Sequence, residues 1–271
     1  MKSLKTIVCT VCLVGSVTAA GFAQNINTVA GVASVPNTVK VVTLSNTSIK
    51  PMLHDAVIYE AKKPSNQSYK MQQGAKEAIE AIEQMGIAYD LYQLQGADAT
   101  GEKDAIVFAL DMKSTMEVIK LDDVKDPMAS VAMQMLEKGD LDPITEQFML
   151  TAVNSQLPIG AKTFDLTESL PKEIETKSQA MYRAIGSDLN NTTQITVQDV
   201  KPLTKIHGAT YNTYTISSRI IGNTGGTFNP YYANAAVVMN PAHPTLYLAI
   251  TSDVQRTYFE PILHEFYKSI K

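Results

Sequence analysis

The chain has 271 residues, of which 45% are hydrophobic and 18% are charged, with a formal net charge of −4, two cysteines and no tryptophan. This length allows one large domain or two small ones, with ample apolar material for a core. The acidic balance argues against nucleic acid and anionic membrane as partners.

The first 23 residues have the pattern of a secretory signal peptide. Lys2 and Lys5 begin it, an apolar run of about a dozen residues follows, and Gly21 and Ala23 form a small-x-small cleavage pattern. A membrane span needs roughly 20 predominantly apolar residues, so this run is too short. We expect cleavage after Ala23 and an exported protein, periplasmic or extracellular, with no membrane span in the mature chain.

Cleavage would also remove both cysteines, Cys9 and Cys12, and leave 248 residues. The mature chain then has no thiolate for a disulfide, a nucleophile or a metal site. Loss of Lys2 and Lys5 changes the net charge from −4 to −6. Exported proteins without cysteine are common in bacteria, whereas small secreted eukaryotic domains usually depend on disulfides. No cofactor is expected.

The first elements after the signal are a lead-in, two strands and a helix. Residues 24–37 are small and polar without a clear period, which predicts a flexible lead-in. Strands are predicted at Val39–Leu44 and Ala56–Ala61. A helix ending at Gly86 follows, because apolar residues recur at helical spacing. They are Met71, Ala75, Ala78, Ile79, Ile82 and Met85.

Three consecutive antiparallel strands are predicted next. Residues 87–94 alternate between two faces, and residues 105–111 and 115–121 have the pattern of a hairpin around Met112-Lys113-Ser114.

Two helices are predicted to start at Asp-Pro pairs. Asp126-Pro127 and Asp142-Pro143 each combine an N-cap with a first-turn proline, and the second helix is expected to end before Leu157-Pro158. Methionines at helical spacing in this part are predicted to pack in the core rather than bind copper. They are Met128, Met133, Met135 and Met149.

The second half of the chain repeats this order loosely. A strand near Thr163–Leu166 precedes an amphipathic helix that begins after Pro171. Turns are predicted at His207-Gly208 and at residues 240–244. The strands predicted around them are Gln194–Val200, Leu203–Ile206, Ala209–Ile221, Ala233–Met239 and Leu246–Thr251.

The stretch HEFYK, His264 to Lys268, contains half of the zinc-protease motif H-E-x-x-H. Lys268 stands where the second histidine is needed, so the motif is incomplete. The surrounding residues instead predict a docked helix, with His264, Glu265 and Lys268 on its solvent side. Its apolar stripe consists of Phe259, Ile262, Leu263, Phe266 and Ile270.

Other catalytic and ligand-binding patterns are also incomplete. Ser169-Leu170-Pro171-Lys172 matches S-x-x-K but lacks the partner motifs, and Ser169 suits a helix N-cap. Residues 222–226 lack the Lys and Ser/Thr of a phosphate loop. No catalytic or metal-binding residue is therefore predicted. The acidic residues that do not match a calcium loop are Asp140, Asp142 and Glu146. The histidines with no recognisable partner nearby in sequence are His54, His207 and His243.

The segment from Lys162 to Lys271 resembles a known family in the order of its elements. The residues that carry the resemblance are LPKEIETKSQAMYRAIGSDLN, ITVQDVKPLTKIHGATYNTYTIS and LYLAITSDVQRTYFEPILHEFYKSI. They resemble the PsbP-like superfamily, whose bacterial members include the periplasmic DcrB-like proteins. The resemblance implies an antiparallel sheet flanked by helices, used as a binding or accessory module, and it carries over no catalytic signature.

We therefore expect an α+β protein with a signal peptide, a lead-in, an N-terminal region over residues 38–156 and a PsbP-like α/β/α sandwich over residues 157–271. Residues 38–156 also run strand, strand, helix, three strands, helix, which raises the hypothesis of a second, diverged copy. The expected function is that of an exported bacterial binding or accessory protein of the cell envelope without catalysis. Its partner would be an unknown protein or a small ligand.

Two other functions stay open. An envelope-acting hydrolase would need a nucleophile and a base that converge in space. Alternatively, an exposed sheet face or edge would allow assembly with itself or with a partner protein.

The best candidate for a binding surface is GNTGGTFNPYY, Gly222 to Tyr232. A hairpin connection commonly needs two to five residues, and this stretch of about eleven residues reads as a long loop. Tyr and Asn on a Gly-rich segment suit recognition. The alternative is that the aromatic side chains fold back onto the core. The candidate binding residues are Asn223, Phe228, Asn229, Tyr231 and Tyr232.

Overall fold

The structure is a computed structural model of the chain. It describes residues 23–44, 79–80, 82–119, 138–165, 194–224 and 227–271. Several predictions from the sequence lie outside these residues: the signal peptide up to residue 22, the strand Ala56–Ala61, the helix at Asp126-Pro127, the cap at Ser169, the helix after Pro171, and the environments of His54, Met128, Met133 and Met135.

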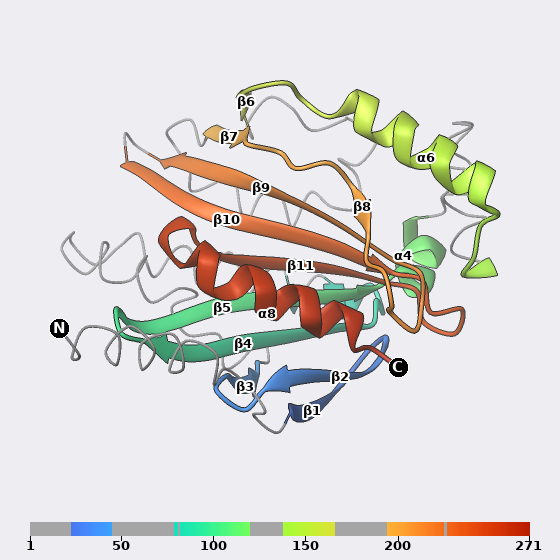
Figure 1. Cartoon of the computed structure of the whole chain (residues 1–271), viewed down its shortest axis with the longest axis horizontal. Helices are drawn as coiled ribbons and strands as arrows, with labels where there is room; N and C mark the ends of the chain where they lie inside the picture. Colours follow the sequence, from blue (N-terminus) through green and yellow to red (C-terminus); the bar gives the residue numbers. More distant parts are fainter. Residues whose placement is uncertain (1–22, 45–78, 81, 120–137, 166–193, 225–226) are drawn as a thin grey trace, which may run out of the picture.

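The described strands form one nine-stranded antiparallel sheet and a separate two-stranded hairpin (Figure 1). In the large sheet the order is β3-β4-β5-β11-β10-β9-β7-β6, and β8 pairs with β9. The expected α+β class with a mostly antiparallel sheet is thus confirmed. The strands are β1 (Ala23–Thr28), β2 (Gly31–Pro36), β3 (Lys40–Thr43), β4 (Tyr89–Asp98), β5 (Gly101–Asp111), β6 (Lys162–Asp165), β7 (Gln194–Gln198), β8 (Thr204–Lys205), β9 (Thr213–Thr224), β10 (Thr227–Val238) and β11 (Thr245–Ser252).

α-Helices and a 3₁₀ helix accompany the sheet in the described residues. The Asp142 carboxylate accepts hydrogen bonds from Ile144 N and Thr145 N, so the predicted cap and first-turn proline of α6 are confirmed. Its predicted end before Pro158 is confirmed as well, since Leu157 is the C-cap. The elements are α4 (Met112–Ile119), α6 (Pro143–Gln156), the 3₁₀ helix η2 (Asp253–Gln255) and α8 (Arg256–Lys268).

The main core lies between α8 and one face of the sheet. Figure 1 shows α8 running along the sheet in front of β11. Its Phe259, Leu263 and Phe266 side chains are buried, as the sequence predicted, and His264 and Glu265 are exposed. Tyr267 is also buried, so the HEFYK stretch is only partly a solvent face.

A second cluster fixes α6 and includes one of the predicted core methionines. Met149 is buried beside Tyr214 and Met239, with Leu150 and Val153 of α6 packed against them. For Met149 the core prediction is therefore confirmed.

The hairpin predicted around Met112-Lys113-Ser114 is wrong. β5 ends at Asp111, and residues 112–119 form helix α4 instead of a third strand. The Asp111 carboxylate accepts a hydrogen bond from Ser114 N, and the Thr115 hydroxyl donates to the Asp111 carbonyl. Asp is a preferred N-cap residue, so Asp111 starts a helix where the sequence predicted a turn.

Residues 24–37 also differ from the expected flexible lead-in. They form most of the β1–β2 hairpin, hereafter the N-terminal hairpin (Ala23–Pro36), in which Ile26 pairs with Ala33. Ala30, Ala33 and Val35 are fully or almost fully buried against the main core. Burial of these small apolar side chains orders a segment whose composition alone predicts disorder.

The regions 38–156 and 157–271 share the single large sheet. β5 of the first region pairs with β11 of the second, with Val107 opposite Ala249. Within the described residues, no helix is long and apolar enough to cross a membrane.

Candidate functional site

The predicted binding loop is part of a long β-hairpin. Thr224 pairs with Thr227, so β9 and β10 leave only positions 225–226 between them, and the prediction of an eleven-residue loop is wrong. Gly-Gly is a favoured two-residue hairpin connection, which the loop interpretation overlooked. Pro230 lies beyond the end of β11, whose pairing with β10 starts at Tyr231, so at this position β10 is bonded to β9 alone.

The candidate binding residues do not form one surface. In the hairpin register Asn223 lies opposite Phe228, and Asn229 lies opposite Gly222. Phe228 is 64% exposed, whereas Tyr232 is 1% exposed and belongs to the main core. Tyr231 is half-buried and packs against the cluster of Ile79, Leu91 and Ile106. Since successive side chains in a strand point to opposite faces, Tyr231 and Tyr232 cannot act together. Phe228 is the aromatic residue of this group that solvent can reach.

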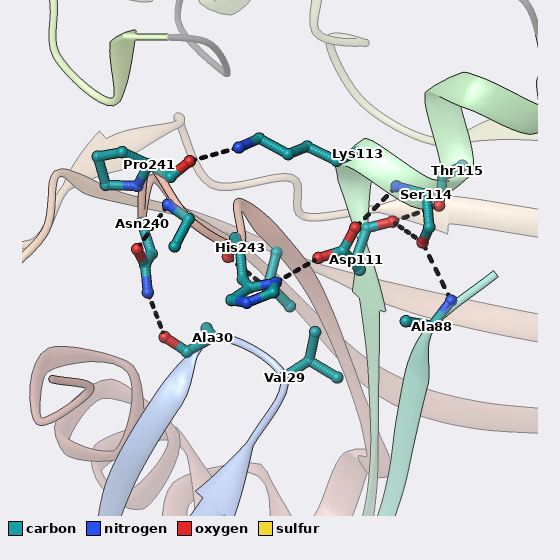
Figure 2. Close-up of polar contacts among 12 residues, drawn as sticks. Val29, Ala30, Ala88, Asp111, Lys113, Ser114, Thr115, Asn240, Pro241 and His243 are labelled. Atoms are coloured by element: carbon teal, nitrogen blue, oxygen red, sulfur yellow. Dashed lines mark hydrogen bonds and ion pairs between the residues drawn. The ribbon is translucent and has the colours of Figure 1, made fainter.

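A second candidate site lies at the opposite end of β10. We call Asp111, Ser114, Asn240 and His243 the polar corner, because these residues join the start of α4 to the connection between β10 and β11 (Figure 2). Backbone contacts fix this junction: Met112 N donates to the Pro244 carbonyl at 2.7 Å.

Asp111 is the centre of the polar corner. Its side chain is 6% exposed, and its Oδ2 lies 3.2 Å from His243 Nδ1. Its Oδ1 accepts a hydrogen bond from Ser114 N at 2.8 Å. The Ser114 hydroxyl donates to the Asp111 carbonyl and accepts from Ala88 N. Figure 2 shows His243 and Ser114 on opposite sides of Asp111.

Asn240 and Lys113 hold the connection between β10 and β11 from two sides. The buried Asn240 amide donates from Nδ2 to the Ala30 carbonyl at 2.7 Å, and its Oδ1 accepts from Ala242 N. Lys113 Nζ donates to the Pro241 carbonyl at 2.6 Å. The connection is thereby tied to the N-terminal hairpin and to α4.

This geometry defines the chemistry available at the polar corner. The buried Asp111 carboxylate lies beside Nδ1 of His243, whose side chain is 61% exposed. An exposed imidazole that is oriented by a carboxylate can act as a general base. The Ser114 hydroxyl, however, is bonded to the main chain and not to His243. His243 lies at the surface, but it is not isolated. Its partner lies 132 positions away in sequence, and no local pattern signals the pair. His207 does lie in an exposed turn before Gly208, as predicted.

The acidic residues near α6 are also bonded to protein groups. Asp140 accepts from Asn212 Nδ2 at 2.7 Å, and Asp142 caps α6. Glu146 accepts hydrogen bonds from the Tyr214 hydroxyl and, at 2.7 Å, from Lys205 Nζ. In the part of the chain that the structure describes, no three His, Cys, Asp or Glu side chains are grouped as a metal site.

Glu146 has a shifted pKa for a physical reason. Burial alone would raise the pKa of this carboxyl, but the hydrogen bonds from Lys205 and Tyr214 hold it below its ordinary value. Burial and the same Glu146 contact raise the pKa of Tyr214. Glu146 is therefore a charged residue that fixes α6 to β8 through Lys205 and to β9 through Tyr214.

Comparison with protein-family models, curated proteins and solved structures finds no match to this chain. The site is thus defined by its own geometry alone.

Proposed function

We propose that the chain is an exported bacterial protein of the cell envelope, periplasmic or extracellular, which binds a partner without catalysis. The Lys-led apolar run with Gly21 and Ala23 supports export. Cleavage at the expected site would remove Ala23, which pairs with Pro36, and keep the pairs of the N-terminal hairpin from Gln24 to Thr28. Cleavage after Ala23 would therefore leave the body of the N-terminal hairpin whole.

The proposal includes a PsbP-like α/β/α sandwich in residues 157–271. What supports it is the antiparallel path through β7, β9, β10 and β11 with α8 packed on one face. Two diverged copies remain part of the proposal. Support comes from the symmetry of the two hairpins β4–β5 and β10–β11, whose last strands meet antiparallel at the centre of the sheet.

The observation that carries the non-catalytic assignment is the hydrogen bonding of the polar corner. Nucleophilic catalysis by serine needs the hydroxyl within hydrogen-bond reach of the base. Here Ser114 and His243 contact different atoms of Asp111. The Asp111 carboxylate and the Ser114 hydroxyl both form hydrogen bonds that stabilise the first turn of α4, which is a structural role.

Phe228 is the residue proposed to contact the partner. Phe228 is 64% exposed near a hairpin tip, outside the main core. Aromatic residues are enriched where proteins bind one another.

The test compares Phe228→Ala with Val254→Ala, a matched change at another exposed apolar residue, 75% exposed. Both variants should unfold within about 0.5 kcal/mol of the parent chain. Only Phe228→Ala should lose the protein or ligand that the immobilised mature chain retains from a bacterial envelope extract. Retention of the same partner by Phe228→Ala would rule out this surface.

An envelope-acting hydrolase is the alternative, and the Asp111–His243 pair favours it. If His243 acts as a base on water, the mature protein should hydrolyse a nitrophenyl ester, and His243→Ala should abolish this turnover. Ser114→Ala is the control, because a structural serine leaves the rate unchanged. The binding function predicts no turnover above that of His243→Ala.

A further inference from the structure

The side of α6 that points away from the sheet has large apolar residues at its start and small residues at its end. Ile144 is 82% exposed and Phe148 is 67% exposed, whereas Met149 on the opposite side is buried. Thr151 and Ser155 are exposed as well, and Figure 1 shows α6 at the periphery of the described chain. At about 100° per residue, the four exposed residues lie within roughly 60° of one another. We call Ile144, Phe148, Thr151 and Ser155 the outer stripe.

The two hydroxyl groups of the outer stripe already have partners within the helix. Thr151 Oγ1 donates to the Gln147 carbonyl at 2.8 Å, and Ser155 Oγ donates to the Ala152 carbonyl at 2.7 Å. A hydroxyl that donates to its own helix loses little when water is removed, because its donor stays satisfied. The outer stripe can therefore enter an interface without leaving an unsatisfied donor.

The outer stripe is also uncharged, although the chain is acidic. Glu146 is the one charged residue in the sequence of α6, and its carboxylate is bonded to Lys205 and Tyr214 on the sheet side. The chain has a net charge of −4, so two copies repel each other on average. Through the outer stripe they can approach without adding a like-charge contact. Aromatic residues with few charges around them are typical of the centre of a protein interface.

The spacing of the outer stripe is self-complementary. In an antiparallel pair of α6 helices, a two-fold axis can pass through the middle of the helix, between positions 149 and 150. Positions at equal distances on either side of this axis then face each other. Phe148 lies opposite Thr151 of the second copy, and Ile144 lies opposite Ser155 of the second copy. Each large side chain thus meets a small one, which allows two helices to pack closely.

We propose that the chain forms a homodimer through α6, in which the outer stripes of two copies pack antiparallel. The helix has 14 residues, or about 21 Å, so the contact buries less than a standard interface of roughly 1,600 Å². The dimer is therefore weak and reversible, and half-formed at about 100 µM. Figure 1 shows the tip of the β9–β10 hairpin at the other end of the sheet from α6, so Phe228 stays accessible in both copies.

Sedimentation velocity of the mature chain tests the dimer between about 5 and about 500 µM. The parent chain should be monomeric at the lower limit and mainly dimeric at the upper one. Phe148→Glu should lose at least about tenfold in affinity, because it places two carboxylates near the two-fold axis. Val254→Glu is the matched control. It adds the same charge at an exposed apolar residue outside α6 and should dimerise like the parent chain.

Cysteine substitutions test the register, since the mature chain, which begins at Gln24, has no cysteine of its own. Ile144→Cys mixed with Ser155→Cys should form a disulfide between the two chains on mild oxidation, because facing positions bring their Cα atoms within about 7 Å. Neither variant should crosslink with itself. Equivalent positions in the antiparallel pair lie about 16 Å apart along the helix axis.

A parent chain that stays monomeric at about 500 µM would overturn the dimer. Crosslinking of Ile144→Cys with itself, or no crosslink in the mixture, would overturn the antiparallel register. If the parent chain is monomeric and Phe148→Glu melts at a lower temperature than Val254→Glu, residues of the same chain outside the described ranges cover the outer stripe, which also overturns the proposal. Phe228→Ala should dimerise like the parent chain, so failure of the partner site at Phe228 and failure of the dimer are separate results.

Discussion

At the scale of single residues, the buried hydroxyl of Tyr267 lowers the stability of the main core. It is 1% exposed and packs between Tyr247 and Phe266, with ring centroids 5.6 and 5.4 Å away. Its hydroxyl has no hydrogen-bond partner among the described residues. Burial raises the pKa of this phenol well above its ordinary value, so the group stays neutral. A buried polar group without a partner loses its hydration and gains nothing in return.

Tyr267→Phe should therefore leave the free energy of unfolding unchanged or raise it by about 1 kcal/mol. Tyr247→Phe is the matched control, because the Tyr247 hydroxyl is bonded to Thr28 and its loss should cost about 1 kcal/mol. Chemical denaturation at neutral pH measures both. A loss of stability in Tyr267→Phe equal to that in Tyr247→Phe would contradict the assignment.

Residue roles were only partly accessible from the sequence. The alternative that the aromatics of residues 222–232 fold back onto the core applies to Tyr232, and Phe228 is exposed. Phe228 is exposed and Tyr232 buried because Phe228 lies nearer the tip of the hairpin. The position of the tip depends on the strand register, which the composition does not give. The Asp111–His243 pair needed the tertiary structure, since its members come from different strand ends.

At the scale of elements, α6 is held by the charged group of Glu146, Lys205 and Tyr214. Hydrogen bonds lower the pKa of Glu146 in the folded state, so this group stabilises the fold fully at pH values above the ordinary pKa of a Glu carboxyl. The contribution is lost as the pH falls through the lowered pKa of the folded state. Acidification should thus weaken the docking of α6.

Glu146→Gln should lower the free energy of unfolding by about 1–2 kcal/mol near pH 7. The difference from the parent chain should shrink as the pH falls below about 4.5. Glu117→Gln, at an exposed position of α4, is the control and should show a small difference at both pH values. A Glu146→Gln effect that is constant between pH 7 and 3 would show that the charge of the carboxylate is not involved.

Elements with strong end signals were predictable, and those fixed by distant contacts were not. The N-cap and first-turn proline located α6, and the apolar stripe at helical spacing located α8. α4 has eight residues and starts directly from a strand, and its apolar spacing also fits a short strand. The Asp111 cap was the signal that distinguishes the two. The N-terminal hairpin depends on contacts with residues more than 200 positions away, such as Ser269.

At the scale of the whole molecule, the sheet joins the two regions that the sequence separated at residue 156. Val107 is fully buried and Ala249 is 1% exposed, and they lie opposite each other where β5 meets β11. Separation of the regions would expose this pair and leave β11 paired with β10 alone, as an edge strand beside apolar side chains. We therefore expect one cooperative unfolding unit, even if the regions arose as copies.

Val107→Ala tests this cooperativity from one side of the junction. It should lower the free energy of unfolding by about 1–3 kcal/mol through the cavity it leaves. If the two regions unfold as one unit, this loss lowers the free energy of unfolding of the whole sheet. Amides of β4 in the first region and of β10 in the second should then show the same decrease in the free energy of exchange. Hydrogen exchange at increasing denaturant measures each strand separately, which suits a chain without tryptophan. Phe228→Ala, at an exposed position of β10, should change the exchange of neither strand. Two independently stable copies would instead confine the effect of Val107→Ala to β4 and leave β10 unchanged, because each copy would then unfold around its own core.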